Sequence, residues 1–211
     1  MADTDGAMVS AFPPRLADDV RAVMAVIPAA GYRPMSPFSV DVGGAAVAIP
    51  YRIHHDEPPA DAESTLTTTQ RLILHCLYSR HGEGLVRQRH LEQIVDSSHV
   101  WVAPFVVQLV GEYVLEILEA VQGGLPELDT PQSTYRLLYG AFIARNPSFF
   151  ARTERRVVSY WSCYYRWRYP VFGTYPGCIL MESLRDAAAD HTGRPWPRHT
   201  PLGLADPARP S

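Results

Sequence analysis

The sequence contains no lysine, so all 19 of its cationic side chains are arginines. This absence excludes a lysine Schiff base, a P-loop lysine and a lysine general base. The use of arginine in place of lysine, together with frequent alanine, is typical of a protein from a GC-rich bacterium. Any cationic site must therefore be built from planar guanidinium groups, which bind carboxylates and stack on aromatic rings.

Cysteine and long apolar runs are also scarce. The cysteines Cys76, Cys163 and Cys178 are widely spaced and odd in number, so the sequence predicts neither a disulfide framework nor a CxxC metal site. No apolar run approaches the roughly 20 residues that span a bilayer, and the first residues lack the pattern of a secretory signal. These absences lead us to expect a reduced cytoplasmic protein that makes no membrane contact, and its formal net charge of −3 indicates a soluble, mildly acidic chain.

The distribution of proline divides the chain into three parts. Residues 1–14 are expected to be a flexible N-terminus. Five prolines between Pro195 and Pro210 predict that residues 192–211 form a disordered Pro/Arg-rich tail. The part between them, 15–191, is long enough for one hydrophobic core and is predicted to be a single helical domain.

One β-hairpin is predicted at about 38–53. Two apolar runs flank Gly43 and Gly44, and paired glycines supply the positive φ angles of a tight turn. Pro50 predicts that the second strand lies at a sheet edge.

The rest of the chain follows a helical period. Thr67 and Gln70 have the spacing of a capping box, which predicts that a helix begins there. Other helices are predicted at about 16–27, 85–95, 102–121, 133–144, 147–167 and 179–190. Because strands and helices do not alternate, the predicted fold is mostly α, either a helical bundle or a short HEAT-like array of helical hairpins, preceded by the β-hairpin.

The HEAT-like alternative rests on the fragment EGLVRQRHLEQIV. This fragment and the apolar helix that follows it resemble a HEAT-type helical hairpin over about a fifth of the chain. The resemblance implies stacked pairs of helices, but no repeat period extends it to the rest of the sequence.

Charges are segregated along the second half of the chain. Gln108, Glu112, Glu116 and Glu119 follow one another at helical steps, which predicts one acidic stripe on the long helix. From residue 131 to residue 169 there are seven arginines and a single acid, Glu154. Such blocks can pair with each other or form solvated faces, and they can also bind a partner.

Aromatic side chains are concentrated in the same arginine-rich segment, which holds ten of the 22 aromatic residues between Phe149 and Tyr175. Some of them share one helical face and are predicted to be core. The others fall among arginines and predict a binding surface. The candidate binding residues are Arg152, Arg155, Arg156, Tyr160, Tyr164, Arg166, Trp167 and Arg168, with Glu112 and Glu116 as an acidic patch.

Eight histidines raise the question of a metal site. The run His54-His55-Asp56-Glu57 offers four potential ligands, but neighbours on an extended strand point to opposite faces. HxxxH and HExxH spacings are absent, as are GxSxG and GxGxxG motifs. The sequence therefore predicts neither a metal site nor a cofactor.

Two functional hypotheses remain. The first is a small cytoplasmic helical protein that recognises a protein partner, or a second copy of itself, through the arginine and aromatic residues, as an adaptor, regulator or immunity-type protein does. The alternative is a cofactor-free enzyme of specialised metabolism whose pocket holds an anionic or planar substrate. His75, His90, Tyr160 and Tyr164 would then be acid/base candidates and Arg156 an anion clamp. Nucleic acid is disfavoured as a partner because the sequence pI is about 6.2.

Overall fold

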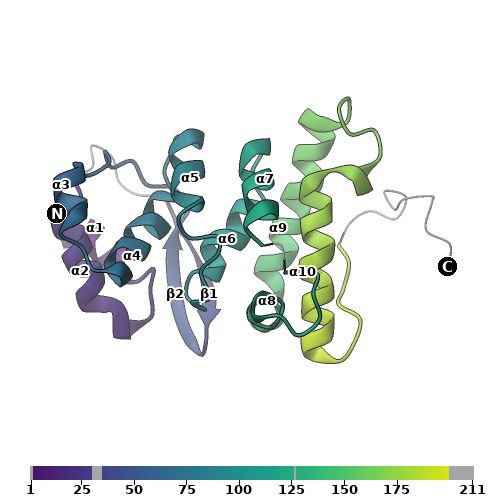
Figure 1. Ribbon diagram of the computed structural model, residues 1–211, viewed down its shortest axis with the longest axis horizontal. Helices are drawn as coiled ribbons and strands as arrows, with labels where there is room; N and C mark the ends of the chain where they lie inside the picture. Colours follow the sequence, from purple (N-terminus) through teal and green to yellow (C-terminus); the bar gives the residue numbers. More distant parts are fainter. Residues whose placement is uncertain (1, 30–34, 126, 200–211) are drawn as a thin grey trace. The chain divides into compact units, whose positions relative to one another are not determined.

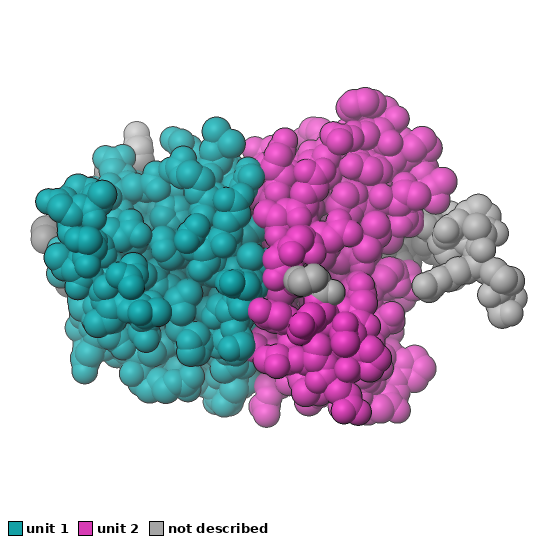
Figure 2. Space-filling view, in the orientation of Figure 1, with its two compact units in different colours: residues 1–105 teal, residues 106–211 magenta. Residues whose placement is uncertain are grey.

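A computed structural model of the chain describes residues 2–29, 35–125 and 127–199 (Figure 1). These residues form ten α-helices and one two-stranded antiparallel sheet, so the predicted mostly helical fold with a β-hairpin is confirmed. The part of the predicted tail from 200 to 211 lies outside the described residues. The chain divides into two compact units, unit 1 (1–105) and unit 2 (106–211), which are described separately below (Figure 2). That residues 15–191 form a single domain stays a prediction.

Unit 1 combines short helices with the β-hairpin. In chain order it contains α1 (Ala2–Val9), a 3₁₀ turn (Pro14–Leu16), α2 (Ala17–Val26), β1 (Pro37–Val42), β2 (Ala45–Pro50), α3 (Ala60–Ser64), α4 (Thr68–Tyr78) and α5 (Gly84–Leu91). Helix α1 lies in the segment that was expected to be a flexible N-terminus, where the sequence predicts no regular element.

The hairpin forms as its turn residues predict. Gly43 and Gly44 have φ angles of 62° and 93°, and the Gly44 amide donates to the Asp41 carboxylate at 2.9 Å. Strand β1 pairs with β2 from Val42 opposite Ala45 to Pro37 opposite Pro50. Alternate residues of both strands are buried, so one face of the hairpin contributes to the core of unit 1.

Two fully buried arginines hold the loops of unit 1. Arg80 donates to the Tyr51 carbonyl at 2.8 Å, and Arg87 donates to the carbonyls of His81 and Gly82 at 2.9 and 2.8 Å. Because a buried guanidinium must be hydrogen-bonded, these contacts fix the segments that follow β2 and α4. The predicted capping box at Thr67 and Gln70 is confirmed at the start of α4.

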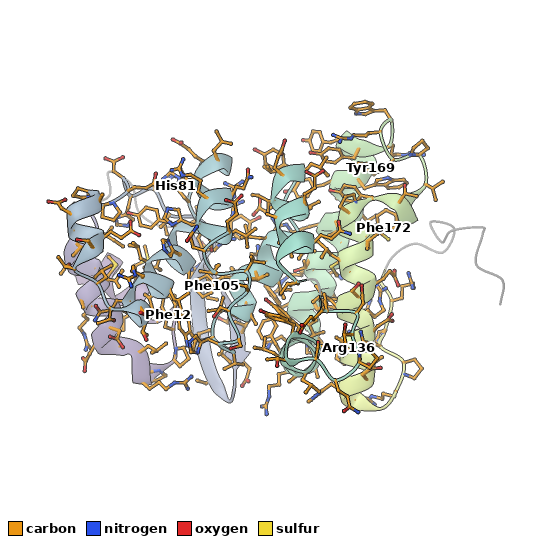
Figure 3. All side chains as sticks on the ribbon, in the orientation of Figure 1. Phe12, His81, Phe105, Arg136, Tyr169 and Phe172 are labelled. Carbon is orange, nitrogen blue, oxygen red and sulfur yellow. The ribbon has the colours of Figure 1, made fainter. Side chains whose placement is uncertain are left out.

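Unit 2 is built from longer helices. It contains α7 (Leu115–Gly124), α8 (Thr134–Arg145), α9 (Pro147–Tyr160), a π-helical turn (Trp161–Tyr165), a 3₁₀ turn (Phe172–Thr174) and α10 (Pro176–Thr192), while α6 (Ala103–Val110) contains the boundary between the units. Figure 3 labels Phe172, whose ring packs against Trp161 with centroids 5.0 Å apart. This contact closes the loop between α9 and α10.

The prediction of a single long helix at 102–121 is wrong, because the chain breaks between α6 and α7. The break occurs where α9 comes close: a Cβ on Gly111 would lie 3.2 Å from the Thr153 methyl carbon. Glu112 is also buried there and pairs with Arg156 of α9. An unbroken apolar period conceals this break, since both helices bury the same kind of face.

Helices α8 and α10 pack closely side by side (Figure 1). A Cβ on Gly140 of α8 would lie 2.3 Å from the Ala187 carbonyl oxygen of α10, a distance that real Cβ atoms do not reach. Arg136 on α8 also donates to Asp190 on α10 at 2.6 Å (Figure 3). The missing side chain at Gly140 therefore sets the distance between the two helices.

The substitution Gly140→Ala is expected to lower the free energy of unfolding by about 2 kcal/mol, because the added methyl group forces the two backbones apart. Gly123→Ala is the matched control, since a Cβ on Gly123, near the end of α7, meets no atom within 4 Å. Urea unfolding followed by circular dichroism measures both variants. Equal stability of the two variants would contradict the close packing at Gly140.

Candidate functional site

The predicted arginine and aromatic residues lie on α9 and on the turn that follows it. Helix α9 is strongly amphipathic and buries Phe149, Phe150 and Val157. Beyond it, Trp167 is 81% exposed and Tyr164 is 58% exposed. We call the surface formed by Arg152, Arg155, Arg156, Tyr160, Tyr164, Arg166, Trp167 and Arg168 the arginine–aromatic surface.

Four arginines of this surface have no carboxylate partner within the described residues. Arg152 and Arg155 are exposed on α9. Arg166 lies over the Trp161 ring at 5.4 Å and Arg168 over the Tyr169 ring at 5.6 Å. Their guanidinium groups are therefore available to an external carboxylate.

Arg156 differs from these four arginines, because it takes part in internal contacts. Its NH2 atom lies 3.7 Å from the Glu112 carboxylate, and its guanidinium lies 5.9 Å from the centre of the Tyr160 ring. Its side chain is only 22% exposed. Arg156 therefore serves the packing of unit 2 and is a weaker candidate for an anion clamp.

Three tyrosine rings lie close to one another at the end of α9, where Arg156 contacts Tyr160. The rings of Tyr113, Tyr160 and Tyr164 lie 5.9 to 6.3 Å apart, centre to centre. The Tyr165 hydroxyl donates to the Tyr113 carbonyl at 2.5 Å, and the Trp167 indole donates to the Tyr164 carbonyl at 2.9 Å. These hydrogen bonds hold the side chains of Tyr165 and Trp167 against the backbone beside the three tyrosine rings.

The predicted acidic stripe is not formed, because its helix is broken. Glu112 is 1% exposed and Gln108 is 4% exposed, whereas Glu116 and Glu119 are exposed on α7. Burial raises the pKa of Tyr165, and the charge of Glu116 raises it further. Glu116 therefore lies near the arginine–aromatic surface, while Glu112 lies beneath it.

A second buried ion-pair network joins α9 to α10. The fully buried Glu154 accepts from Arg185, which also pairs with Glu182 at 2.6 Å. Arg198 donates to both oxygens of Glu182 at 2.6 Å, and this pairing holds the described start of the predicted tail against α10. The single acid of the arginine-rich segment is thus a structural residue.

The other two candidates, His75 and His90, come together in unit 1. Their Nδ1 atoms lie 2.8 Å apart, and His90 Nε2 lies 2.8 Å from Glu57 Oε1. Arg89 donates to the other Glu57 oxygen at 2.5 Å. We call the series Glu57, His90 and His75 the histidine relay. Glu57, His75 and His90 each stand out in the sequence as polar candidates. Their contacts join α4, α5 and the loop after β2, so the spacing of the residues along the chain does not predict these contacts.

Burial sets the protonation of the histidine relay. It lowers the pKa of His75 to about 4, with help from the charges of His90 and Arg71. It also lowers the pKa of His90, against the opposing effect of Glu57. Burial alone would raise the pKa of Glu57, but the hydrogen bonds from His90 and Arg89 and their charges together lower it below its usual value. At neutral pH the two imidazoles are therefore uncharged and the carboxylate is ionised.

The acid/base candidates of the enzyme hypothesis fall in different units. His75 and His90 belong to unit 1, whereas Tyr160, Tyr164 and Arg156 belong to unit 2. Open grooves of about 770 Å³ in unit 1 and about 740 Å³ in unit 2 are lined by none of these five residues. Within unit 1, His75 and His90 contact each other directly.

Comparison with known proteins adds no assignment: no protein-family model, curated protein or solved structure matches the chain. Among the described residues, no three side chains of the ligating types are arranged to hold a metal ion. None of the described helices combines the length and the apolar character that crossing a bilayer requires.

Acid is expected to destabilise the protein through the histidine relay. The pKa of His75 is lower in the folded chain than in the unfolded chain, so the unfolded state binds more protons between pH about 6.5 and about 4. The contribution of the neutral His75 imidazole to the free energy of unfolding is complete above pH about 6.5 and is lost as the pH falls towards about 4. We expect the free energy of unfolding to fall by about 2 kcal/mol over this window.

The check is a series of urea unfolding curves at several pH values for the wild type and for His75→Gln. The variant lacks one of the two imidazoles, so its stability should depend less steeply on pH. Identical slopes for the two proteins would exclude His75 as a source of the acid sensitivity.

Proposed function

We propose that this protein binds an acidic segment of a partner protein through the arginine–aromatic surface. The observation that carries the proposal is the combination of four guanidinium groups that have no carboxylate partner among the described residues with the exposed rings of Trp167 and Tyr164. Arginine, tryptophan and tyrosine are the residues that contribute most to protein interfaces. The guanidinium groups supply paired hydrogen bonds to carboxylates, and the rings supply apolar contact area.

Two features favour a protein over a nucleic acid as the partner. The exposed carboxylate of Glu116 lies near the surface and repels a continuous phosphate backbone, whereas the acids of a protein segment can be spaced to avoid it. The chain as a whole has a net charge of −3, so it lacks the overall positive charge that is typical of nucleic-acid-binding proteins.

We place this binding in the cytoplasm. The three cysteines are free, and Cys163 is exposed. An exposed free thiol is typical of a reducing compartment.

The test uses a display library of random peptides that is selected on the purified wild-type protein. Selected peptides should be rich in Asp and Glu with an interspersed apolar residue. Trp167→Ala should weaken binding of the best peptide at least about tenfold, as loss of an interface anchor does. The double variant Arg166→Glu, Arg168→Glu should weaken it further, because it replaces attraction by repulsion.

Exposed residues elsewhere give the matched controls. Leu85→Ala removes an apolar side chain that is 72% exposed in unit 1, and Arg15→Ala removes an exposed arginine of the same unit. Both should leave the affinity unchanged. Selection of peptides without acidic residues, or tight binding of a single-stranded oligonucleotide at low salt, would overturn the proposal.

A further inference from the structure

The histidine relay of unit 1 has a direction, which its hydrogen bonds determine. A carboxylate can only accept, and Arg89 keeps that of Glu57 ionised, so His90 donates from Nε2 across 2.8 Å. A neutral imidazole has one N–H, so the His90 Nδ1 atom must accept. His75 therefore donates from Nδ1 across the 2.8 Å contact, and its Nε2 atom carries a lone pair.

The opposite direction is disfavoured. If His90 donated from Nδ1 to His75, its Nε2 lone pair would face the Glu57 carboxylate at 2.8 Å. Two acceptors at that distance repel each other and leave a buried nitrogen without its hydrogen bond. Because His90 is only 6% exposed, water cannot compensate for this loss.

Surrounding contacts hold the histidine relay in place. The Tyr78 ring stacks on His90 with centroids 5.0 Å apart, and its hydroxyl donates to the Asp56 carbonyl next to Glu57 at 2.5 Å. The ring of His81, labelled in Figure 3, also stacks on Tyr78, with centroids 6.2 Å apart. The buried Arg80 and Arg87 fix the adjoining loops. Such rigidity is what a positioned catalytic group requires.

We propose that His75 is a general base that activates water for the hydrolysis of a neutral ester, with His90 and Glu57 as its positioning residues. The His75 side chain retains 14% of its exposed surface, so water can reach it. This proposal is independent of the binding function proposed for unit 2.

Glu63 defines the environment of the reacting nitrogen. Its Oε1 atom lies 3.7 Å from His75 Nε2, which is too long for a direct hydrogen bond. A water molecule that donates to the nitrogen can donate to this oxygen as well. The carboxylate also disfavours an anionic group at this point, which is why the expected substrate is uncharged.

The chemical step balances within the histidine relay. His75 Nε2 takes a proton from water, and the water oxygen attacks the ester carbonyl carbon. The bond between that carbon and the alcohol oxygen then breaks, and the alcohol oxygen leaves with the electron pair and receives the proton from Nε2. During the step His75 keeps its Nδ1 hydrogen bond to His90, and His90 keeps its hydrogen bond to Glu57, so the imidazole of His75 stays in one orientation.

The histidine relay can hold one added proton and not two. With one proton the Nδ1 atom of His75 still donates to that of His90. With two protons both Nδ1 atoms are donors, and the 2.8 Å contact between them cannot persist. Burial lowers the pKa of His75 to about 4, so the base is unprotonated at neutral pH.

The first test is the protonation state of His75 in the ¹⁵N-labelled wild-type protein, measured by long-range ¹H–¹⁵N NMR at neutral pH. We expect the proton of His75 on Nδ1 and that of His90 on Nε2. A proton on His75 Nε2 would overturn the proposal. Because this measurement uses the wild type, it does not depend on whether a variant folds.

The second test uses Glu57→Gln. The amide oxygen should stay with Arg89, which leaves the amide NH₂ facing His90 Nε2. His90 must then accept at Nε2 and donate from Nδ1, so the proton of His75 moves to Nε2 and the base is lost. A merely structural role for Glu57 would not move this proton, and a proton that stays on Nδ1 would contradict the positioning role.

The third test measures hydrolysis of p-nitrophenyl acetate. His75→Gln and Glu57→Gln should each lower the rate at least about tenfold, the low side of what a positioned base contributes. His99→Gln, which changes an exposed histidine, and Cys163→Ser, which removes the exposed thiol, should leave the rate unchanged. A His75→Gln variant that is as active as the wild type would overturn the assignment of the base.

Discussion

The pairing of Glu112 with Arg156 is the contact on which the arrangement of unit 2 depends. Glu112 is 1% exposed, and a carboxylate in that position requires a cationic partner. Arg156 meets it from α9, and Gly111 lets the two segments approach. The chain breaks at this point, between α6 and α7, and Tyr113 in the break contacts Tyr160 of α9 and Tyr164 of the turn that follows it.

This pairing also divides the arginines of unit 2 by role. Arg156 and Arg185 are held by the buried acids Glu112 and Glu154. The remaining exposed arginines of the arginine–aromatic surface have no carboxylate partner among the described residues. In a chain without lysine, each of these cations is a planar fork, so the surface is suited to carboxylates and aromatic groups rather than to diffuse negative charge.

Local chemistry could be predicted from the sequence, and long-range pairing could not. Gly43 and Gly44 predict the hairpin, and Thr67 with Gln70 predicts the start of α4, because each depends on neighbouring residues. The break near Gly111 depends on α9, which lies some forty residues further along the chain. The contact of His75 with His90 depends likewise on α4, α5 and the Glu57 loop folding together. The exposed ring of Trp167 was predicted, because its position departs from the buried face of α9.

The most direct measurement of the central claim is an NMR titration of the ¹⁵N-labelled protein with an acidic peptide that it selects. Binding at the arginine–aromatic surface should shift the backbone amides of residues 152–169 and the indole N–H of Trp167, and added salt should reverse these shifts. Shifts confined to unit 1 or to α8, or shifts that salt leaves unchanged, would contradict the assignment of the binding surface.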